Sequence, residues 1–267
     1  MLIAQISDTH ILPPGERLAG RIDPATRLAQ AVRTLKSLDV VPDCVLATGD
    51  LADRGEPEAY AELRRSLAAL AAPVYAIPGN HDRREPLRQA FADAPWMPKD
   101  PGSRLCYRVA LGDLVLVALD SLVEGEDYGM LGDAQLDWLA RELGAIGPRP
   151  VLVMLHHPPV ASGIAVMDTM KLRDADRLGT IVARHPNVER IVCGHLHRAM
   201  HLRWNGTVVS VPSSTVEQVE LALSPTERRL GMVQEPPGLL LHRWLPGQGL
   251  VSHNVPVGEF PGPFRYE

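Results

Sequence analysis

Cysteine is scarce in this sequence, and long apolar runs are absent. Only three of the 267 residues are cysteines, and an odd number argues against a disulfide framework. Cys44, Cys106 and Cys193 lie in apolar, strand-like runs without metal-ligand spacing, so we expect buried free thiols. No apolar run approaches the ~20 residues that span a bilayer, so no membrane partner is expected.

Positive charge is neither dominant nor clustered. The chain has 27 Lys and Arg against 32 Asp and Glu, a net charge of -5. No basic run stands out, so we expect no nucleic acid polymer as a partner. The opening residues 1–7 lack the basic segment and cleavage site of a signal peptide. Together with the free thiols, this favours a cytoplasmic protein.

Apolar and charged contents of 45% and 22% are ordinary for a globular chain of this length. We expect one domain over 1–267, with a core over 1–200 and a β-rich part over about 201–267 that completes the second of two sheets. Short apolar runs predict strands over 1–7, 42–48, 73–78, 104–110, 114–119, 151–155 and 188–193. Helical spacing of apolar residues predicts helices over 23–38, 56–70, 86–91, 133–144 and 174–185.

Local signals mark several element ends. Asp23 followed by Pro24 is typical of an N-cap and first helical position. Asp133 is expected to cap the fourth helix and Gly144 to end it. Asn205-Gly206 predicts a hairpin of 200–204 with 207–211, and 239–245 with 250–255 suggest another. Strands with crossover helices followed by hairpins predict an α/β fold in which two sheets pack face to face with helices outside.

Polar side chains follow five of the predicted strands. They are Asp8 and His10, Asp50, Asn80-His81-Asp82, His156-His157, and the two histidines of Gly194-His195-Leu196-His197. Each alone has an ordinary explanation, such as a turn, a helix cap or a satisfied core histidine. Because ligands bind beyond the carboxyl ends of the strands in open α/β sheets, all five together predict one site.

The donors in these segments are oxygen and imidazole, without thiolate. Such donors suit Mn, Fe, Zn or Co and disfavour a closed structural zinc site. The candidate ligands are Asp8, His10, Asp50, Asn80, His156, His195 and His197. They are too many for one ion but would serve two ions that share a carboxylate. Asp50 is the expected bridge, and His157 is expected to point to the other side from His156.

These segments resemble the calcineurin-like metallophosphoesterases, whose pattern is D-x-H, G-D, G-N-H-[DE], H and G-H-x-H. The opening Met1 to His10 and His156-His157-Pro158-Pro159 with Met167-Asp168 resemble the branch of class III cyclic nucleotide phosphodiesterases and bacterial glycerophosphodiesterases. The resemblance implies a four-layer αββα sandwich of two mixed sheets. It also implies hydrolysis of small phosphodiesters, cyclic nucleotides or glycerophosphodiesters, by a metal-bound hydroxide.

The resemblance assigns the donors to two metal ions. Asp8, His10, Asp50 and His197 would hold the first ion, and Asp50, Asn80, His156 and His195 the second. His81 and Asp50 would be the catalytic residues, with His81 stabilising phosphate or assisting the leaving group.

Two segments depart from this pattern or point elsewhere. The glycerophosphodiesterase branch predicts a histidine near Thr215 to Gln218, where this chain has Glu217. Gly49 to Gly55 also resembles the G-D-x-x-D-R-G segment of protein serine/threonine phosphatases, although Asp53-Arg54 is also explained as a solvated pair. A phosphomonoesterase or protein phosphatase is therefore an alternative, and a non-catalytic scaffold on this fold is another.

The surroundings of the site carry weaker signals. The loops 11–22, 122–131 and 160–171 are expected to rim the pocket. The apolar strand around Leu239 to Leu241 has little helix pattern left to cover it, so we expect a homo-oligomer in which a partner covers it.

Overall fold

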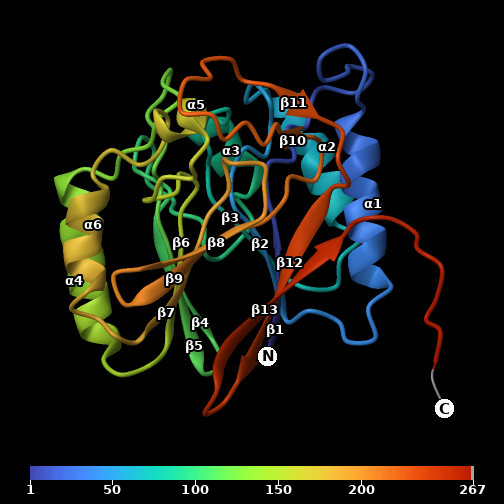
Figure 1. Ribbon diagram of the computed structural model, residues 1–267. Coiled ribbons are helices and arrows are strands. Elements are labelled where there is room, and N and C mark those ends of the chain that lie inside the picture. The colour runs from blue at the N-terminus through green and yellow to red at the C-terminus, as the bar shows by residue number, and fades with distance from the viewer. Residues whose placement is uncertain (266–267) are drawn as a thin grey trace.

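Two β-sheets pack face to face between two layers of helices in the computed structural model, which describes residues 1–265 (Figure 1). The first sheet has the order β13-β12-β1-β2-β3, and the second has the order β4-β5-β6-β7-β9-β8. Strands β1 to β3 run parallel, as do β5, β6, β7 and β9. This is the predicted αββα sandwich of two mixed sheets.

The strands of the first sheet are β1 (Leu2–Ile6), β2 (Cys44–Ala47), β3 (Val74–Ala76), β12 (Gly238–Leu245) and β13 (Gly249–Pro256). Those of the second are β4 (Tyr107–Leu111), β5 (Leu114–Ala118), β6 (Val151–Met154), β7 (Val188–Val192), β8 (Met200–Trp204) and β9 (Thr207–Val211). A small ribbon pairs β10 (Gln218–Val219) with β11 (Met232–Val233).

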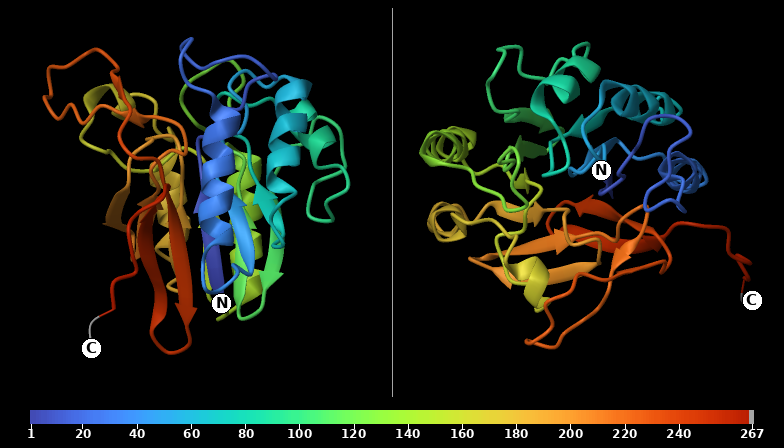
Figure 2. Two further views of the ribbon diagram at one scale, coloured as in Figure 1. Left: turned by 90° about the vertical axis from the view of Figure 1, so that its right-hand side faces the viewer. Right: turned by 90° about the horizontal axis from the view of Figure 1, so that it is seen from above.

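The helices are α1 (Pro24–Lys36), α2 (Pro57–Leu67), α3 (Arg84–Ala90), α4 (Asp133–Ile146), α5 (Ala165–Asp168) and α6 (Ala175–Val182). In Figure 1, α4 and α6 stand along one flank of the molecule and α1 along the other, and Figure 2 shows the sheets between them. The parallel strands β1 to β3, and likewise β5 to β7, are therefore connected through helices outside the sheets, whereas β7 and β9 are connected through β8.

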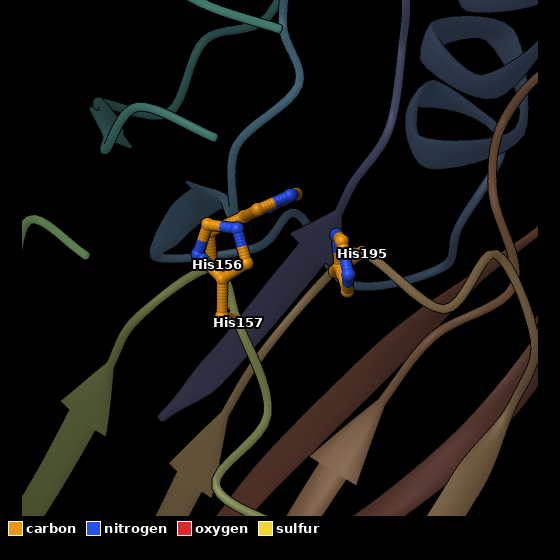
Figure 3. A group of neighbouring side chains, drawn as sticks. All are labelled: His156, His157 and His195. Atoms are coloured by element: carbon orange, nitrogen blue, oxygen red, sulfur yellow. The ribbon is translucent and has the colours of Figure 1, made fainter. Parts of the chain in front are cut away.

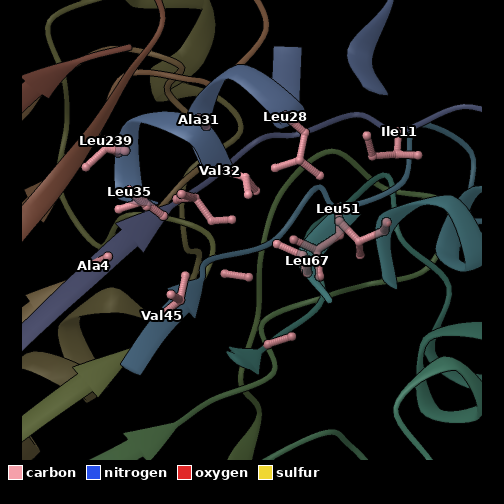
Figure 4. Packing of buried hydrophobic residues seen from close by; sticks show 14 of the residues in the cluster. Ala4, Ile11, Leu28, Ala31, Val32, Leu35, Val45, Leu51, Leu67 and Leu239 are labelled. Atoms are coloured by element: carbon pink, nitrogen blue, oxygen red, sulfur yellow. The ribbon is translucent and has the colours of Figure 1, made fainter. Parts of the chain in front are cut away.

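Side-chain alternation along the strands builds three buried layers. On β1, Ala4 and Ile6 face the helices, where they pack in the cluster that contains Leu28 and Leu35 of α1 (Figure 4). Ile3 faces the other way, into the layer between the sheets, which also contains Leu152. Successive strand residues point to opposite faces, so a strand buried on both faces is apolar throughout.

Helix boundaries follow the sequence signals with two corrections. Asp23 is the N-cap of α1, with its Oδ1 accepting a hydrogen bond from the Thr26 amide at 3.2 Å. Asp133, in contrast, is the first residue of α4, whose N-cap is Gly132, and the helix passes Gly144 and ends at Ile146, with Gly147 as its C-cap. The carboxylate of Asp174 accepts hydrogen bonds from the amides that precede α4, which draws the N-cap one residue earlier than predicted.

The strand predicted over 104–110 begins only at Tyr107. Arg104 instead donates to main-chain carbonyls of the loop beyond β5, including that of Asp120 at 2.9 Å, and this contact takes the chain out of the sheet. Cys44 and Cys193 are buried free thiols as predicted, whereas Cys106 precedes β4 and is only half-buried.

The C-terminal strands do not all complete the second sheet as expected. The hairpin β8-β9 joins the second sheet through β7, but β12 pairs antiparallel with β1 of the first sheet. Leu239 and Leu241 then pack against α1, and β13 covers the other edge of β12. Leu239 to Leu241 are therefore buried within one chain, and the argument for a covering partner was wrong. The homo-oligomer stays a prediction without that support. Among residues 1–265, no helix combines the length and the apolar character needed to cross a membrane.

Candidate metal centre

The five polar segments come together at the carboxyl ends of the parallel strands, as predicted. Main-chain hydrogen bonds tie their loops to one another: the Asp8 amide donates to the Gly49 carbonyl at 3.0 Å and the His10 amide to the Asp50 carbonyl at 2.9 Å. Beneath them, Gln5 donates to the Cys193 carbonyl at 2.8 Å and so joins β1 to the end of β7. This edge lies at the top of Figure 1.

A first group contains Asp8, His10, Asp50 and His197, all buried, with one potential ligand atom of each within 4.8 Å of the others. The Nε2 atoms of His10 and His197 are 3.0 Å apart. Asp8 Oδ1 is 3.5 Å from Nε2 of His197, and Asp50 Oδ2 is 3.8 Å from Nε2 of His10. These are the four residues that the resemblance assigned to one metal ion.

A second group surrounds His156. Its Nε2 lies 3.2 Å from Asp50 Oδ2 and 3.2 Å from Asn80 Oδ1. Nδ1 of His195 lies 3.0 Å from the same amide oxygen. Asp50 Oδ2 therefore lies between His10 of the first group and His156 of the second, which is the position expected of a bridging carboxylate.

Hydrogen bonds at Nδ1 fix the orientation of two of these imidazole rings. Nδ1 of His156 donates to the Thr48 carbonyl at 2.7 Å, and Nδ1 of His197 donates to the Glu217 carbonyl at 2.8 Å. A neutral imidazole carries one N–H, so the Nε2 atoms direct lone pairs at the acceptor oxygens around them. Acceptors facing acceptors need positive charge between them, which divalent metal ions would supply at both groups and a proton would supply at His156.

Buried atoms without partners add to this fit. Within residues 1–265, Asp8 Oδ2 and His195 Nε2 are buried and have no hydrogen-bond partner. Buried polar atoms are seldom left unsatisfied. Oxygen and imidazole donors with lone pairs to offer suit Mn, Fe, Zn or Co, so the residues present fit the two ions that the sequence predicted.

The pKa values favour the metal-binding protonation state at Asp50 and His195 and oppose it at His156. Burial would raise the pKa of Asp50, but His156 and His81 outweigh it and hold the pKa well below its ordinary value. Burial and the nearby His156 lower the pKa of His195 to about 3. At neutral pH, Asp50 is therefore ionised and His195 is neutral. Burial also opposes charge on His156, yet the Asp50 carboxylate raises its pKa to about 9, so a metal ion competes with a proton there.

The backbone at the centre is held in an uncommon conformation. Five of the candidate ligands have positive φ: Asp8, His10, Asp50, His195 and His197. Left-handed backbone costs an L-residue roughly 1–2 kcal/mol and concentrates at functional sites. The glycines before these turns permit close approach, since a Cβ at Gly49 would overlap His156 and one at Gly79 would overlap Asp50.

His157 lies closer to the centre than predicted. Figure 3 shows His156 and His157 following β6 and His195 following β7. The three rings offer nitrogens within 4.8 Å of one another, and the His157 and His195 ring centres are 4.7 Å apart. Nδ1 of His157 contacts Ser121 Oγ at 2.8 Å, and its Nε2 is buried without a partner among the described residues. The expectation that it points to the other side was wrong because both residues lie beyond the last residue of β6, where strand alternation ends.

Asp53 is a site residue that the sequence reasoning missed. Its side chain is only 18% exposed, and Oδ1 accepts a hydrogen bond from Nδ1 of His10 at 2.9 Å. Such a contact orients a ligand histidine. Arg54 does behave as a solvated side chain, half exposed and paired with Glu16 and Glu56. The available signal was the spacing of Asp53 three residues after Asp50.

His81 follows Asn80 of the second group in the chain, but its ring lies beside His10 of the first group. Its amide donates to Asp50 Oδ1 at 2.9 Å, and its ring meets that of His10 edge to face with centres 4.7 Å apart. Its Nδ1 contacts the Asp53 carbonyl at 2.8 Å. The loop itself is held by Asp82, whose buried carboxylate accepts hydrogen bonds from Tyr60 and from the Gly79 amide, at 2.8 Å each. His81 is therefore free of the structural role that Asp82 fills.

Two cavities meet at this centre. The smaller, about 270 Å³, contains the candidate ligands, and its apolar wall is formed by Leu18, Met167, Met170, Val219, Leu230 and Met232. The larger, about 530 Å³, is polar and mostly acidic, with walls that include Glu85, Glu124 and Glu126 besides Arg54 and Arg83. Asp53, Asn80, His81 and Asp127 line both.

The three predicted rim loops do line the cavities, through Leu18, Asp127 and Met167. Residues of the segment 217–232 also line the smaller cavity, and this segment has no periodic pattern of apolar residues that would predict such a position.

Comparisons with known proteins agree with this architecture. Residues 1–199 match the model of the calcineurin-like phosphoesterase family. A probable glycerophosphodiester phosphodiesterase from Arcobacter nitrofigilis is 33% identical over all of this chain and 97% of its own length. A cAMP/cGMP dual specificity phosphodiesterase from Mycobacterium tuberculosis is 35% identical over 98% of this chain and 83% of its own. A dimetal phosphatase from Danio rerio shares the fold, with a TM-score of 0.63 and 15% identity over 97% of this chain and 99% of that one.

The fold and the donor set are those of a metal-dependent phosphoesterase. The chain belongs to the calcineurin-like phosphoesterase family.

Proposed function

We propose that the chain is a phosphodiesterase that hydrolyses small diesters, cyclic nucleotides or glycerophosphodiesters, at two divalent metal ions. The observation that carries this proposal is the pair of cavities that meet at Asn80 and His81. A glycerophosphodiester has two separate organic arms on one phosphate. One arm would enter the smaller, largely apolar cavity and the other the polar one, with the phosphate at their junction. Both ester oxygens of a cyclic nucleotide belong to one ribose, so the nucleoside would enter one cavity and leave the other to solvent.

The relatives support the diester. Two proteins that match nearly all of this chain are named as a glycerophosphodiesterase and a cyclic nucleotide phosphodiesterase. Each substrate class combines a phosphate monoanion with a compact organic group. The acidic walls of the larger cavity would repel a doubly charged monoester more than a singly charged diester.

Asp8, His10, Asp50 and His197 would hold the first ion, and Asp50, Asn80, His156 and His195 the second. Metal ions at such a centre polarise phosphoryl oxygens and lower the pKa of bound water. The chain supplies the rest: Asp50 keeps the two groups together, and Asp53 and the Thr48 and Glu217 carbonyls fix the ligand imidazoles.

His81 is the proposed proton donor. It is exposed to both cavities, and its Nδ1 is fixed by the Asp53 carbonyl. A histidine beside the scissile bond can donate a hydrogen bond to developing charge or protonate a leaving alkoxide.

The proposal is tested with protein reconstituted separately with Mn²⁺, Zn²⁺, Co²⁺ and Fe²⁺. We expect kcat/KM on bis(p-nitrophenyl) phosphate to exceed that on p-nitrophenyl phosphate. The reverse order would identify a phosphomonoesterase or protein phosphatase. Full metal occupancy without turnover of either ester would identify a scaffold. A panel with 3′,5′-cyclic AMP and glycerophosphoethanolamine then separates the two diester classes.

A further inference from the structure

Glu217 carries a buried carboxylate in the wall of the smaller cavity. The residue is 5% exposed, and its Oε2 has no hydrogen-bond partner within residues 1–265. The guanidinium of Arg21 lies 3.8 Å away, beyond hydrogen-bond distance, on a side chain that is 57% exposed. A buried carboxylate oxygen without a donor costs free energy unless something satisfies it. The missing donor therefore points to a ligand.

The main chain of Glu217 fixes this carboxylate relative to the centre. Its carbonyl accepts the hydrogen bond from Nδ1 of His197 at 2.8 Å, and the same residue lines the smaller cavity. The acidic residues Asp53 and Asp127 line both cavities, whereas Glu217 lines only the smaller one, beside the apolar side chains of Val219 and Met232.

We propose, on the basis of the proposed function, that Glu217 selects diesters whose organic arm in the smaller cavity carries a hydroxyl group close to the phosphate. The carboxylate accepts a hydrogen bond from that hydroxyl, while the apolar side chains contact the carbon skeleton. A site built to accept a hydrogen bond from a substrate hydroxyl discriminates strongly against an analogue that lacks it.

A hydroxyl fits better than the other groups a carboxylate binds. In the part of the chain that the structure describes, Glu217 is absent from the groups whose potential ligand atoms lie within 4.8 Å of one another, so a metal role is not favoured. Arg21 already supplies positive charge nearby, so a neutral donor suffices and a cationic arm would compete with the guanidinium.

The hydroxyl has two chemical sources, the ribose 2′-hydroxyl of a cyclic nucleotide and the hydroxyls of glycerol. Matched compounds separate them. One pair is 3′,5′-cyclic AMP and its 2′-deoxy analogue, and the other is glycerophosphoethanolamine and its n-propyl analogue. Each is measured as a competitor of bis(p-nitrophenyl) phosphate hydrolysis, which gives an apparent inhibition constant whether or not the compound is turned over.

The wild-type protein should bind the hydroxyl compound of one pair ~10-fold or more tightly than its analogue, the effect of one hydrogen bond to a charged acceptor. Glu217→Ala should remove this preference, and Glu217→Gln should restore part of it because the amide oxygen still accepts. Glu235→Gln is the control, since Glu235 is half exposed, pairs with Arg198 and lies outside both cavities of the centre; it should keep the full preference.

Equal inhibition constants in both pairs for the wild-type protein would overturn the role of Glu217 and leave the proposed diesterase activity standing. A preference that survives in Glu217→Ala would also overturn it. Metal content distinguishes a structural role. Every variant retains the main-chain carbonyl that binds His197, so both ions should stay bound, and loss of metal in Glu217→Ala or Glu217→Gln would refute the assignment. Failure to hydrolyse bis(p-nitrophenyl) phosphate would count against the proposed function instead.

Discussion

The Nε2 atoms of His10 and His197 face each other at 3.0 Å, although 187 residues separate them in the chain. Both rings are held from behind, His10 by the Asp53 carboxylate and His197 by the Glu217 carbonyl. Two nitrogens that bind one ion at ~2.1 Å and at a right angle are ~3 Å apart. The separation therefore suits two ligands of the same ion, and it suggests how the centre responds to mutation.

Asp50 should matter more than Asp53. Asp50 lies between the two groups of donors, 3.2 Å from His156 and 3.8 Å from His10, whereas Asp53 contacts Nδ1 of His10, on the far side of that ring, and Nδ1 of His81. Asp53→Asn should weaken metal affinity by ~10–100-fold, the usual effect of losing a residue that orients a ligand, and Asp50→Ala by more. Calorimetric titration of metal-free protein with Mn²⁺ measures both. Asp93→Asn, on an exposed ion pair with Arg64, is the control, and equal losses at positions 50 and 53 would reject the bridging role.

His156 and His157 provide a second comparison. His156→Ala should lose roughly one metal ion per chain at limiting metal, because a lost donor weakens a site more than a lost neighbour. His157→Ala should keep both ions, since its Nδ1 already contacts Ser121 Oγ at 2.8 Å. Metal analysis after gel filtration gives the stoichiometry. A metal deficit in His157→Ala as large as in His156→Ala would make His157 a ligand.

Sequence patterns located the centre because its donors follow strands that the patterns also locate. Asp8, Asp50 and His156 each come directly after a short apolar run, and parallel strands end at one edge of a sheet. The side-chain contacts and the backbone conformation of the donors were harder to predict. Strand alternation does not extend past the last residue of a strand, so the position of His157 and the left-handed backbone of His195 were not predictable from local pattern.

The remaining differences arise from contacts between distant parts of the chain. The pairing of β12 with β1 joins segments about 240 residues apart, and no local signal distinguishes this sheet from the other. The position of Glu217 beside the cavity is fixed by the hydrogen bond between its main-chain carbonyl and His197. Its substitution for the expected histidine was visible in the sequence, but its burial beside the centre was not.

His242 should lower the free energy of unfolding at acid pH, independently of the metal ligands. It is buried between β1 and β13, where Nε2 contacts Gln5 and Nδ1 contacts Ser252. Burial, with Arg190 and His201 nearby, lowers its pKa to about 3. In the unfolded chain its pKa is ~6.5, so the unfolded state takes up a proton that the folded state refuses. Its contribution to stability is therefore present above pH ~6.5 and is lost as the pH falls toward 3.

His242→Gln should reduce the slope of the free energy of unfolding against pH by up to ~1.4 kcal/mol per pH unit, the linkage value for one proton. Urea unfolding of metal-free protein at several pH values from 6.5 down to 4 measures it. The exposed His253→Gln on β13 is the control. An acid slope identical in His242→Gln and the wild-type protein would contradict the prediction.

The raised pKa of His156 affects stability in the opposite sense. Its contribution to stability is present below pH ~6.5 and is lost as the pH rises through about 9.

His81 gives the sharpest test of the proposed chemistry. Because Asp82 holds the loop and His81 lines both cavities, His81→Ala should retain both metal ions. Its kcat should fall by ~10²-fold or more, the usual size of a lost acid or electrostatic group. Metal analysis and steady-state kinetics on the same preparation separate the two effects. Loss of metal together with activity would return His81 to a structural role.

The leaving group then distinguishes the two ways in which His81 can act. p-Nitrophenolate leaves without needing a proton, whereas the alkoxide of a glycerophosphodiester needs one. If His81 protonates the leaving oxygen, the fall in kcat for His81→Ala should be smaller on bis(p-nitrophenyl) phosphate than on an alkyl diester. If its imidazole instead only stabilises charge on the phosphoryl oxygens, the two substrates should lose the same factor. An equal loss would therefore remove the general-acid role while leaving His81 in contact with the phosphate.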